Sequence, residues 1–340
     1  MLARRSYVEV SYNGIDITNN IQNDLINFRY TDNASEKADD IELTLKDPYS
    51  KWLNEWQPQK GDLISATIHV INWSKEGDNR HLDCGEFIID EPEYSGRPRI
   101  LTLKAISIPS NSNFTTSKKS KIWRNVNIKL IADEIAAKAG LKLFYDCNFM
   151  KAYDVIEQTE TSDMSFLSKI CSDEGLAFKV TNNTIVIFNE AEYEKRAAIY
   201  DYKETKSEVK AYNLKTTLTN TAYAGCNVKY YDPLTEKTIN YLFALKDIDE
   251  KVDKVYQLNI RVKSVNEAKI LAQKTLRNLN KKEYQGSLQV MGNTYLVGSS
   301  CVNLLEFGNL SGKYYINTAT HNVGNGYSTD IGVRKVLEGY

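Results

Sequence analysis

The chain has 340 residues, 42% of them hydrophobic, and exceeds the roughly 250 to 300 residues at which a single core stops growing, so we expect two or three domains. With 43 basic and 44 acidic residues its formal net charge is −1, which leaves no overall field to attract nucleic acid or an anionic membrane. No apolar run approaches the roughly 18 residues of a membrane span, and the N-terminus lacks the apolar region of a secretory signal, so we expect synthesis in a cytoplasm without a signal peptide. The five cysteines are widely spaced, without a C-x-x-C pair, as is typical of reduced thiols.

Residues 1–108 predict mostly strands. Asn13-Gly14 lies between two short apolar-alternating runs, the pattern of a two-residue hairpin. Alternating apolar and polar residues predict further strands at 41–46, 63–71 and 100–106. Several short strands at this spacing favour a barrel or sandwich, so we predict a first β-barrel domain over residues 1–108.

Residues 109–121 contain few apolar side chains and predict a linker. The densest positive run, from Lys118 to Arg124, overlaps this polar stretch. Such a run is more often a solvated face than a phosphate site, so we expect no specific nucleic acid to bind there.

Residues 122–200 predict a helix-strand insert domain. Asn127 is placed to cap a helix whose apolar residues recur at helical spacing, and Gly140 is placed to end it. A second helix begins at Ser162 and ends at Gly175, and an alternating strand follows each glycine. The two units are either an internal repeat or two unrelated helix-to-strand joints. Asn182-Asn183 then predicts a hairpin turn.

Residues 201–340 predict a second β-barrel domain with one long helix over 264–281. Ser264 and Glu267 have the spacing of a capping box at the start of that helix. Residues 189–210, at the boundary with the insert, are charged and tyrosine-rich and predict an outer helix or a linker. Strand patterns flank the long helix, and are found at 212–218, 223–231, 239–245, 288–291, 301–305, 314–319 and 329–336.

The two halves of the chain also resemble each other. The stretch from Gly85 to Asp90, followed by a turn and a strand, has a counterpart from Gly312 to Asn317, again followed by a glycine-bearing turn and a strand. Each predicts a hairpin. The similarity indicates either a duplication or a chance likeness between two β-hairpins.

No arrangement of residues predicts a catalytic, metal or cofactor site. The three histidines, His69, His81 and His321, form no H-x-x-x-H pattern, so we expect neither a metal nor a cofactor. His321 follows a strand beside a glycine turn, which predicts a hydrogen-bonded structural histidine. Among the carboxylates, Glu157 with Glu160 and Asp39 with Asp40 lie in polar stretches and predict solvated side chains, although distant acids could still pair in a glycosidase cleft.

Three stretches resemble the phage late control protein D family, the baseplate hub of contractile phage tails and of phage-derived bacteriocins. They are KSKIWRNVNIKLIADEIAAKAGLKLFYD (119–146), SDMSFLSKICSDEGLAFKVTNNTIVIFNEAEY (162–193) and SGKYYINTATHNVGNGYSTDIGVRKV (311–336). The structural residues that carry the resemblance are Gly140, Gly175, Gly312, His321 and Gly326.

The resemblance implies an α+β, mostly β fold in which two related, tube-type β-barrel domains are separated by the insert. It implies a non-enzymatic homotrimer, a pseudo-sixfold ring that adapts the hexameric tail tube to a trimeric spike. Expected partners are the chain itself, the tail tube protein, other baseplate proteins and, because the chain stops at Tyr340, a separate spike protein. Membrane insertion is not expected, and the particle would be released by lysis. The particle would be an infectious phage, a defective prophage or a bacteriocin. The alternative is a tail-tip enzyme or binding module acting on cell-wall polysaccharide.

Overall fold

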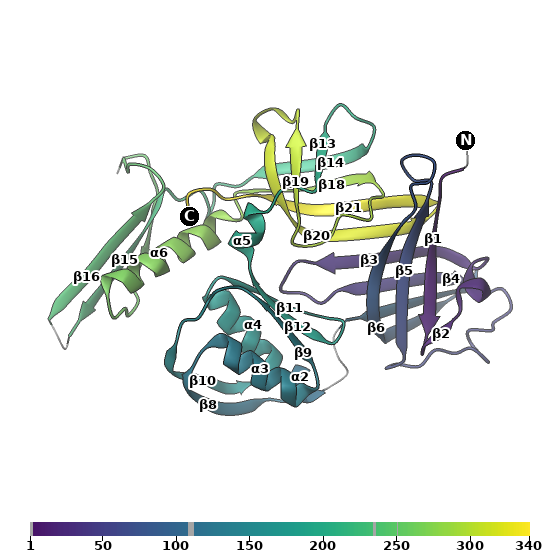
Figure 1. Cartoon of the computed structure of the whole chain (residues 1–340), viewed down its shortest axis with the longest axis horizontal. Helices are drawn as coiled ribbons and strands as arrows, with labels where there is room; N and C mark the ends of the chain where they lie inside the picture. Colours follow the sequence, from purple (N-terminus) through teal and green to yellow (C-terminus); the bar gives the residue numbers. More distant parts are fainter. Residues whose placement is uncertain (1–2, 108–111, 234–235, 250) are drawn as a thin grey trace.

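The structure, a computed structural model, describes residues 3–107, 112–233, 236–249 and 251–340. It consists mostly of β-strands in two β-domains, a helix-strand insert and a projecting arm (Figure 1). The strands form a 13-stranded sheet, two three-stranded sheets and a two-stranded sheet. The predicted class, α+β and mostly β, is confirmed.

The first β-domain precedes the insert in the sequence. Its elements are β1 (Arg5–Tyr12), β2 (Ile15–Asp16), α1 (Thr18–Ile21), β3 (Leu25–Asn33), β4 (Asp40–Lys46), β5 (Leu63–Ile71), β6 (Arg80–Ser95) and β7 (Ile100–Ile106). Alternate residues of these strands are buried, as at Ile64, Ile68 and Val70 of β5. The predicted turn between β1 and β2 is confirmed, because Asn13 and Gly14 have φ values of +47° and +79°.

The insert packs its helices against a three-stranded sheet. Its elements are α2 (Ser112–Thr115), β8 (Lys119–Val126), α3 (Ile128–Ala139), β9 (Lys142–Asp146), β10 (Tyr153–Thr161), α4 (Asp163–Asp173), β11 (Leu176–Thr181), β12 (Thr184–Asn189) and α5 (Glu190–Lys195). The side chain of Asn127 accepts the Leu130 N–H at the start of α3, and Gly140 ends that helix with φ +69°, as predicted. The predicted boundaries of the second helix are also confirmed, since Ser162 caps α4 and Gly175 follows it with φ +72°.

The predicted linker over residues 109–121 differs from the structure. Residues 109–111 lie outside the described residues, residues 112–115 form α2, and Lys119 begins β8. β8 pairs with β10 in a two-stranded sheet, and half of its side chains are exposed. A strand with one buried residue, Trp123, has the polar composition of a loop, which explains why its sequence gives no strand pattern.

The second β-domain follows the insert and is interrupted by the arm. Its elements are β13 (Tyr200–Lys203), β14 (Val209–Thr216), β18 (Tyr284–Met291), β19 (Cys301–Leu305), a 3-10 turn (Gly308–Leu310), β20 (Gly312–Gly324) and β21 (Gly326–Lys335). The arm consists of β15 (Gly225–Asp232), β16 (Lys237–Ala244), β17 (Val255–Leu258) and α6 (Val265–Asn280). Figure 1 shows it extending away from the other parts.

The arm has a core of its own, whereas the sequence predicts a single β-barrel domain over residues 201–340. One face of its three-stranded sheet packs on the buried stripe of α6, formed by Ala268, Ala272 and Leu276. Ser264 caps α6 as predicted, but the carboxylate of Glu267 accepts the N–H of Lys263 rather than that of Ser264. The strands of the arm alternate like those of a barrel, so no local signal separates them from the second β-domain.

The two β-domains have the same strand order. Their sheets read β3-β4-β7-β6-β5-β1 and β14-β18-β21-β20-β19-β13. When the two-residue strand β2 is left aside and the other six strands of each domain are numbered along the chain, both orders become 2-3-6-5-4-1. Strands β3 and β14 therefore occupy equivalent places, and so do β6 and β20.

The register of β6 and β20 agrees with this equivalence. Gly85 and Gly312, both at positive φ, lie at matching places in the pairing with the preceding strand. Five residues later each strand has a β-bulge, at Asp90 in β6 and at Asn317 in β20. Bulges are positions where one extra residue bends a strand, so a shared bulge is a specific similarity.

The register of β3 and β14 agrees as well. β3 has a bulge at Ile26 against β4, and β14 has one at Lys210 against β18. One difference remains, because β1 pairs with β5 antiparallel whereas β13 pairs with β19 parallel. The common order, register and bulges support a duplication, and both hairpins expected from the similar stretches are confirmed.

Candidate assembly site at the joint between the β-domains

The two β-domains are joined by direct strand pairing. β20 pairs through its first residues with β19 and, beyond its bulge, with β3, where Thr318 to Val323 lie opposite Asn33 to Phe28. This ladder makes one 13-stranded sheet out of the two domains. The joint is therefore a place where one β-domain extends the sheet of its neighbour.

His321 lies at the centre of this joint and is fully buried. Its Nε2 is 2.9 Å from the carbonyl oxygen of Leu296, and its Nδ1 is 2.7 Å from the hydroxyl of Tyr327. Because a carbonyl only accepts, we assign the proton to Nε2, and Nδ1 then accepts from Tyr327. The ring also stacks on Tyr30 of β3, with centroids 5.9 Å apart. The predicted hydrogen-bonded histidine is confirmed.

Burial lowers the pKa of His321 to about 4, although the bond to the Leu296 carbonyl acts in the opposite direction. The imidazole is thus neutral at neutral pH. It fills the joint as a hydrogen-bonded aromatic ring rather than as a charge.

The structure does not gather the other predicted site residues around His321. Gly140 and Gly175 follow helices of the insert, Gly312 begins β20 with φ +145°, and Gly326 begins β21 with φ +105°. Each allows a local backbone conformation that favours glycine. Their role as a shared family motif remains a prediction.

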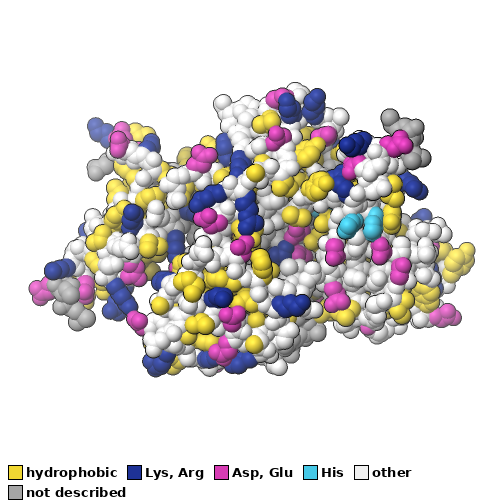
Figure 2. Space-filling model, in the orientation of Figure 1, with side chains coloured by type: hydrophobic (Ala, Val, Ile, Leu, Met, Phe, Trp, Pro, Cys, Tyr) yellow, Lys and Arg dark blue, Asp and Glu magenta, His cyan; other side chains and the backbone are white. Residues whose placement is uncertain are grey.

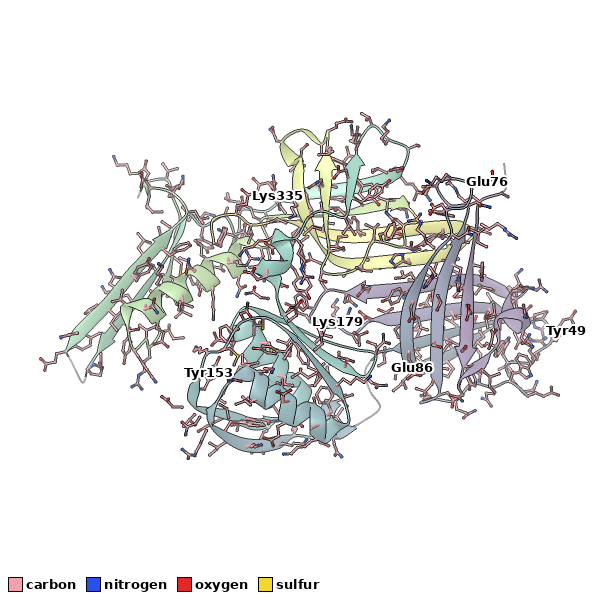
Figure 3. All side chains as sticks on the ribbon, in the orientation of Figure 1. Tyr49, Glu76, Glu86, Tyr153, Lys179 and Lys335 are labelled. Carbon is pink, nitrogen blue, oxygen red and sulfur yellow. The ribbon has the colours of Figure 1, made fainter. Side chains whose placement is uncertain are left out.

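A buried lysine connects the insert to both β-domains. Lys179 of β11 places its Nζ 2.5 Å from the carboxylate of Asp32 in β3 and 2.9 Å from that of Asp39. Asp32 also accepts the N–H of Gly298, which belongs to the second β-domain, at 2.9 Å. Figure 3 shows Lys179 between the insert and the β-domains. Asp39, expected from the sequence to be solvated, is instead buried, because β11 of the insert packs over it and supplies Lys179 as its partner. Burial raises the pKa of Asp39 to about 6, although Lys179 opposes that rise.

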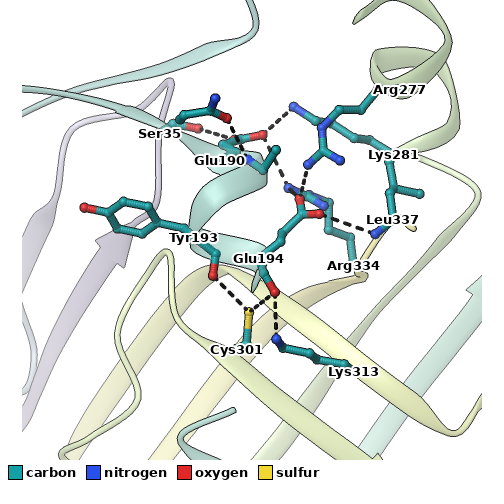
Figure 4. Close-up of polar contacts among 12 residues, drawn as sticks. Ser35, Glu190, Tyr193, Glu194, Arg277, Lys281, Cys301, Lys313, Arg334 and Leu337 are labelled. Atoms are coloured by element: carbon teal, nitrogen blue, oxygen red, sulfur yellow. Dashed lines mark hydrogen bonds and ion pairs between the residues drawn. The ribbon is translucent and has the colours of Figure 1, made fainter. Parts of the chain in front are cut away.

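A second buried cluster surrounds α5 (Figure 4). Glu194, 2% exposed, lies 2.5 Å from Arg334 of β21 and 2.5 Å from Arg277 of α6. Glu190, one turn earlier, pairs with Arg334 at 3.3 Å and with Lys281, the residue that follows α6. Burial alone would raise the pKa of both carboxyls, but their cationic partners outweigh it and hold both pKa values below the usual range. The cluster fixes the end of the insert between the second β-domain and the arm.

A third carboxylate, Glu174 at the end of α4, connects the insert to the arm. It pairs with Lys151 at 2.6 Å, with the hydroxyl of Tyr153 at 2.7 Å and with Lys274 of α6. The three clusters together link all four parts of the molecule. No sequence pattern predicted these clusters, because charged residues at helical spacing usually form a solvated face.

The cavity between the β-domains, about 290 Å³, contains Asp78, which pairs with Arg80 at 3.0 Å. A backbone hydrogen bond from Ser74 holds the pKa of Asp78 below its usual value, so this carboxyl is not a general acid near neutral pH. Among the described residues, no group of three or more His, Cys, Asp and Glu side chains is placed to hold a metal ion. Within the same part of the chain no helix is long and apolar enough to cross a membrane.

Charges on the surface are mixed. The face shown in Figure 2 carries basic and acidic side chains interspersed rather than one large patch of a single sign. This distribution accompanies the formal net charge of −1. It suits contact with proteins more than with a polyanion.

No family model matches the sequence. Among curated proteins, the chain is 27% identical over 173 residues to the probable baseplate hub protein of Escherichia phage 186, and 26% identical over 172 residues to that of Escherichia phage P2. The first match covers 50% of this chain and 42% of the relative, and the second covers 47% and 39%. The matched segments therefore span less than half the length of these relatives.

Solved structures share the fold over nearly the whole chain. The 43 kDa tail protein of prophage MuSo2 from Shewanella oneidensis has a TM-score of 0.71 at 13% identity, with 97% of this chain and 98% of that chain covered. The tail protein from Neisseria meningitidis also has a TM-score of 0.71, at 10% identity, with 97% and 96% covered. An Escherichia coli component of the type VI secretion system has a TM-score of 0.57 at 12% identity, with 99% and 78% covered. This chain is thus related in sequence to phage baseplate hub proteins and has the fold of phage tail proteins.

Proposed function

We propose that this chain is a structural subunit of the baseplate hub in a contractile phage tail or a phage-tail-like particle. Three copies form a ring in which six β-domains face the hexameric tail tube, while the ring itself keeps threefold symmetry for a separate spike protein. The chain is therefore an adapter between two symmetries. It is made in the bacterial cytoplasm, assembles into the particle with other baseplate proteins and is released by lysis.

The observation that carries this proposal is the equivalence of the two β-domains. They share strand order, register and two bulges, so each chain presents two similar surfaces. Three copies of a chain with two similar surfaces present six, which is the number that a hexameric tube requires. The sequence relatives, both probable baseplate hub proteins, support the same reading.

The buried charges support a structural role. Lys179, Glu174, Glu190 and Glu194 each contact more than one part of the molecule, and each is paired with an opposite charge. Such pairs hold domains in one relative position, because separating them would leave an unpaired buried charge. A subunit that transmits position between a tube and a spike needs this rigidity.

The proposal is tested by placing negative charge on the exposed sheet face of the second β-domain. Ser287→Glu combined with Gln289→Glu changes two exposed residues of β18, so the subunit should fold but fail to hold the tail tube in electron micrographs. Asn240→Glu, at an exposed position on β16 of the arm, is the matched control and should leave tube attachment intact. Particles of the β18 variant with normal tubes and normal infection or killing would contradict the adapter function. Clearing of a cell-wall suspension by the purified chain would favour the tail-tip enzyme.

A further inference from the structure

We propose that β14 of one copy pairs antiparallel with residues 91–95 of β6 in a neighbouring copy of this chain. This contact would repeat between subunits the joint that β3 and β20 form within each chain. The inference rests on the proposed hub ring and specifies how its subunits meet.

Both strand edges needed for this contact are open. Among the described strands, β14 pairs only with β18, and Lys210 to Asn213 of β14 are exposed. β6 pairs with β5 only as far as Ile88, while its pairing with β7 continues to Ser95. The last residues of β6 therefore have a partner on one side and none of the described strands on the other. Unpaired strand edges of this kind are templates for pairing with another chain.

The equivalence of the two β-domains identifies the strand that would cover each open edge. β14 takes the place of β3, and β6 takes the place of β20. Within the chain, the edge of β3 is covered by the part of β20 that lies beyond its bulge. The corresponding edge of β14 is uncovered, and so is the part of β6 beyond its bulge at Asp90. A second copy of the chain supplies the missing partner for each edge.

The bulges fix the register of the proposed contact. Thr31 lies opposite Thr320 in the internal joint, and Tyr30 lies opposite His321. When β3 is replaced by β14 and β20 by β6 at equivalent positions, Lys215 lies opposite Glu93.

The next position brings an apolar pair together. In the same register, Leu214 lies opposite Tyr94, where the internal joint has Tyr30 and His321. Both side chains are partly buried in their own domains, so each has an apolar surface left to cover. Opposite charges and an aromatic-aliphatic pair directly across two antiparallel strands both stabilise the ladder.

The charges of the two edges are complementary. β14 carries Lys210 and Lys215, whereas the end of β6 carries Glu91 and Glu93, all of them exposed. Lys104 of β7 lies 3.2 Å from Glu91 and 3.9 Å from Glu93, so these three side chains keep one net negative charge. Two copies of β14 repel each other, and so do two copies of β6, so that only the unlike edges attract. Pro92, which takes the place of Ala319, has no N–H and shortens the hydrogen-bond ladder, but it leaves the neighbouring pairs in place.

A contact between two different edges is head-to-tail. Each copy offers one β14 edge and one β6 edge, so that every copy has two neighbours and the arrangement closes into a ring when the rotation allows it. The number of copies is set by the geometry of the two joints. The proposed function requires a ring of three copies.

Cysteine pairing tests the register directly. Lys215→Cys and Glu93→Cys in the same full-length chain should give chains linked by disulfides after mild oxidation, both in concentrated protein and in purified particles. Lys210→Cys with Glu93→Cys is the matched control, because it makes the same charge changes at positions that are not opposite each other. The unmodified chain shows the background from its own five cysteines.

Charge exchange gives an independent readout in native mass spectrometry. Lys215→Glu or Glu93→Lys alone should weaken ring association roughly tenfold, and the two together should restore it. Lys229→Glu, on the exposed side of β15 in the arm, should leave association unchanged.

The outcomes separate this inference from the proposed function. A ring that forms without the cross-link between positions 215 and 93 overturns the strand pairing and leaves the hub proposal standing. A cross-link to a different baseplate protein at β14 also overturns the pairing. Absence of any ring, in solution and in particles, overturns both.

Discussion

Replacing Glu194 by Gln should destabilise the fold strongly. The side chain is 2% exposed and sits between Arg334 and Arg277, each at 2.5 Å. Glutamine keeps the shape but removes the charge, leaving Glu190 as the one carboxylate facing the guanidinium groups and Lys281 (Figure 4). The buried Arg334 would then keep its longer pair with Glu190, and the partly buried Arg277 would lose its ion pair with Glu194.

The size of the expected destabilisation follows from the burial of Glu194. Removing one partner of a buried ion pair costs about 3 to 5 kcal/mol, because the remaining charge has lost both water and its partner. The retained amide oxygen still accepts a hydrogen bond, so we expect about 3 kcal/mol at neutral pH. The matched control is Glu192→Gln on the same helix, where an exposed carboxylate pairs with Lys195, and there we expect less than about 1 kcal/mol.

Urea denaturation followed by circular dichroism measures both free energies of unfolding. The pH dependence adds a second check. Because the pKa of Glu194 is lowered in the folded chain, its stabilising effect is complete above about pH 4.5 and is lost as the pH falls through the lower folded value. The difference between wild type and Glu194→Gln should therefore shrink in acid. Equal losses for Glu194→Gln and Glu192→Gln would refute the reasoning.

Three further substitutions test other parts of the structure. Gly175→Val should lower stability by about 1 kcal/mol or more in thermal melting, through the backbone alone, because the space beside this glycine is open and its φ is +72°; an unchanged melting temperature would contradict the strain. The wild type should lose up to about 3 kcal/mol of unfolding free energy as the pH falls from 6.5 toward 4, because His321 has an ordinary pKa of 6.5 and a folded pKa of about 4. His321→Phe should lack this pH-dependent loss, and identical pH profiles of the unfolding midpoint in the two proteins would argue against it. Ile131→Ala should cost about 2 to 5 kcal/mol in urea denaturation, because the side chain is fully buried. Leu130→Ala, at a 54% exposed neighbour, should cost less than about 0.5 kcal/mol, and similar losses at both positions would show that the helix faces are misassigned.

Sequence patterns of a few residues correctly predicted the helix ends and the first hairpin turn. The caps at Asn127 and Ser264 and the positive φ values at Gly140 and Gly175 follow from residues within a few positions of each helix end. The turn at Asn13-Gly14 follows in the same way. These features needed no knowledge of the tertiary fold.

The candidate site depends on distant residues and was largely missed. Glu190 and Glu194 lie in a stretch that predicts an outer helix or a linker, and they are buried only because Arg334 and the arm approach from later parts of the chain. Lys179 gave no signal for the same reason, since its partners precede it by more than 130 residues. His321 was identified as structural, but its place at the joint depends on the pairing of β20 with β3.

The boundary of the arm could not be predicted from the sequence pattern either. Its strands alternate like those of the β-domains, and only the sheet topology separates them. The same topology revealed that the two β-domains share their bulges, which the similar stretches around Gly85 and Gly312 indicated only in part.

In the proposed hub ring, three copies of this chain present six β-domains to the tail tube. A reconstruction of the assembled particle by electron cryomicroscopy, without imposed symmetry, counts the copies around the tube axis. We expect three copies, with both β-domains of each facing the tube. One copy, six copies, or β-domains that lie away from the tube would contradict it.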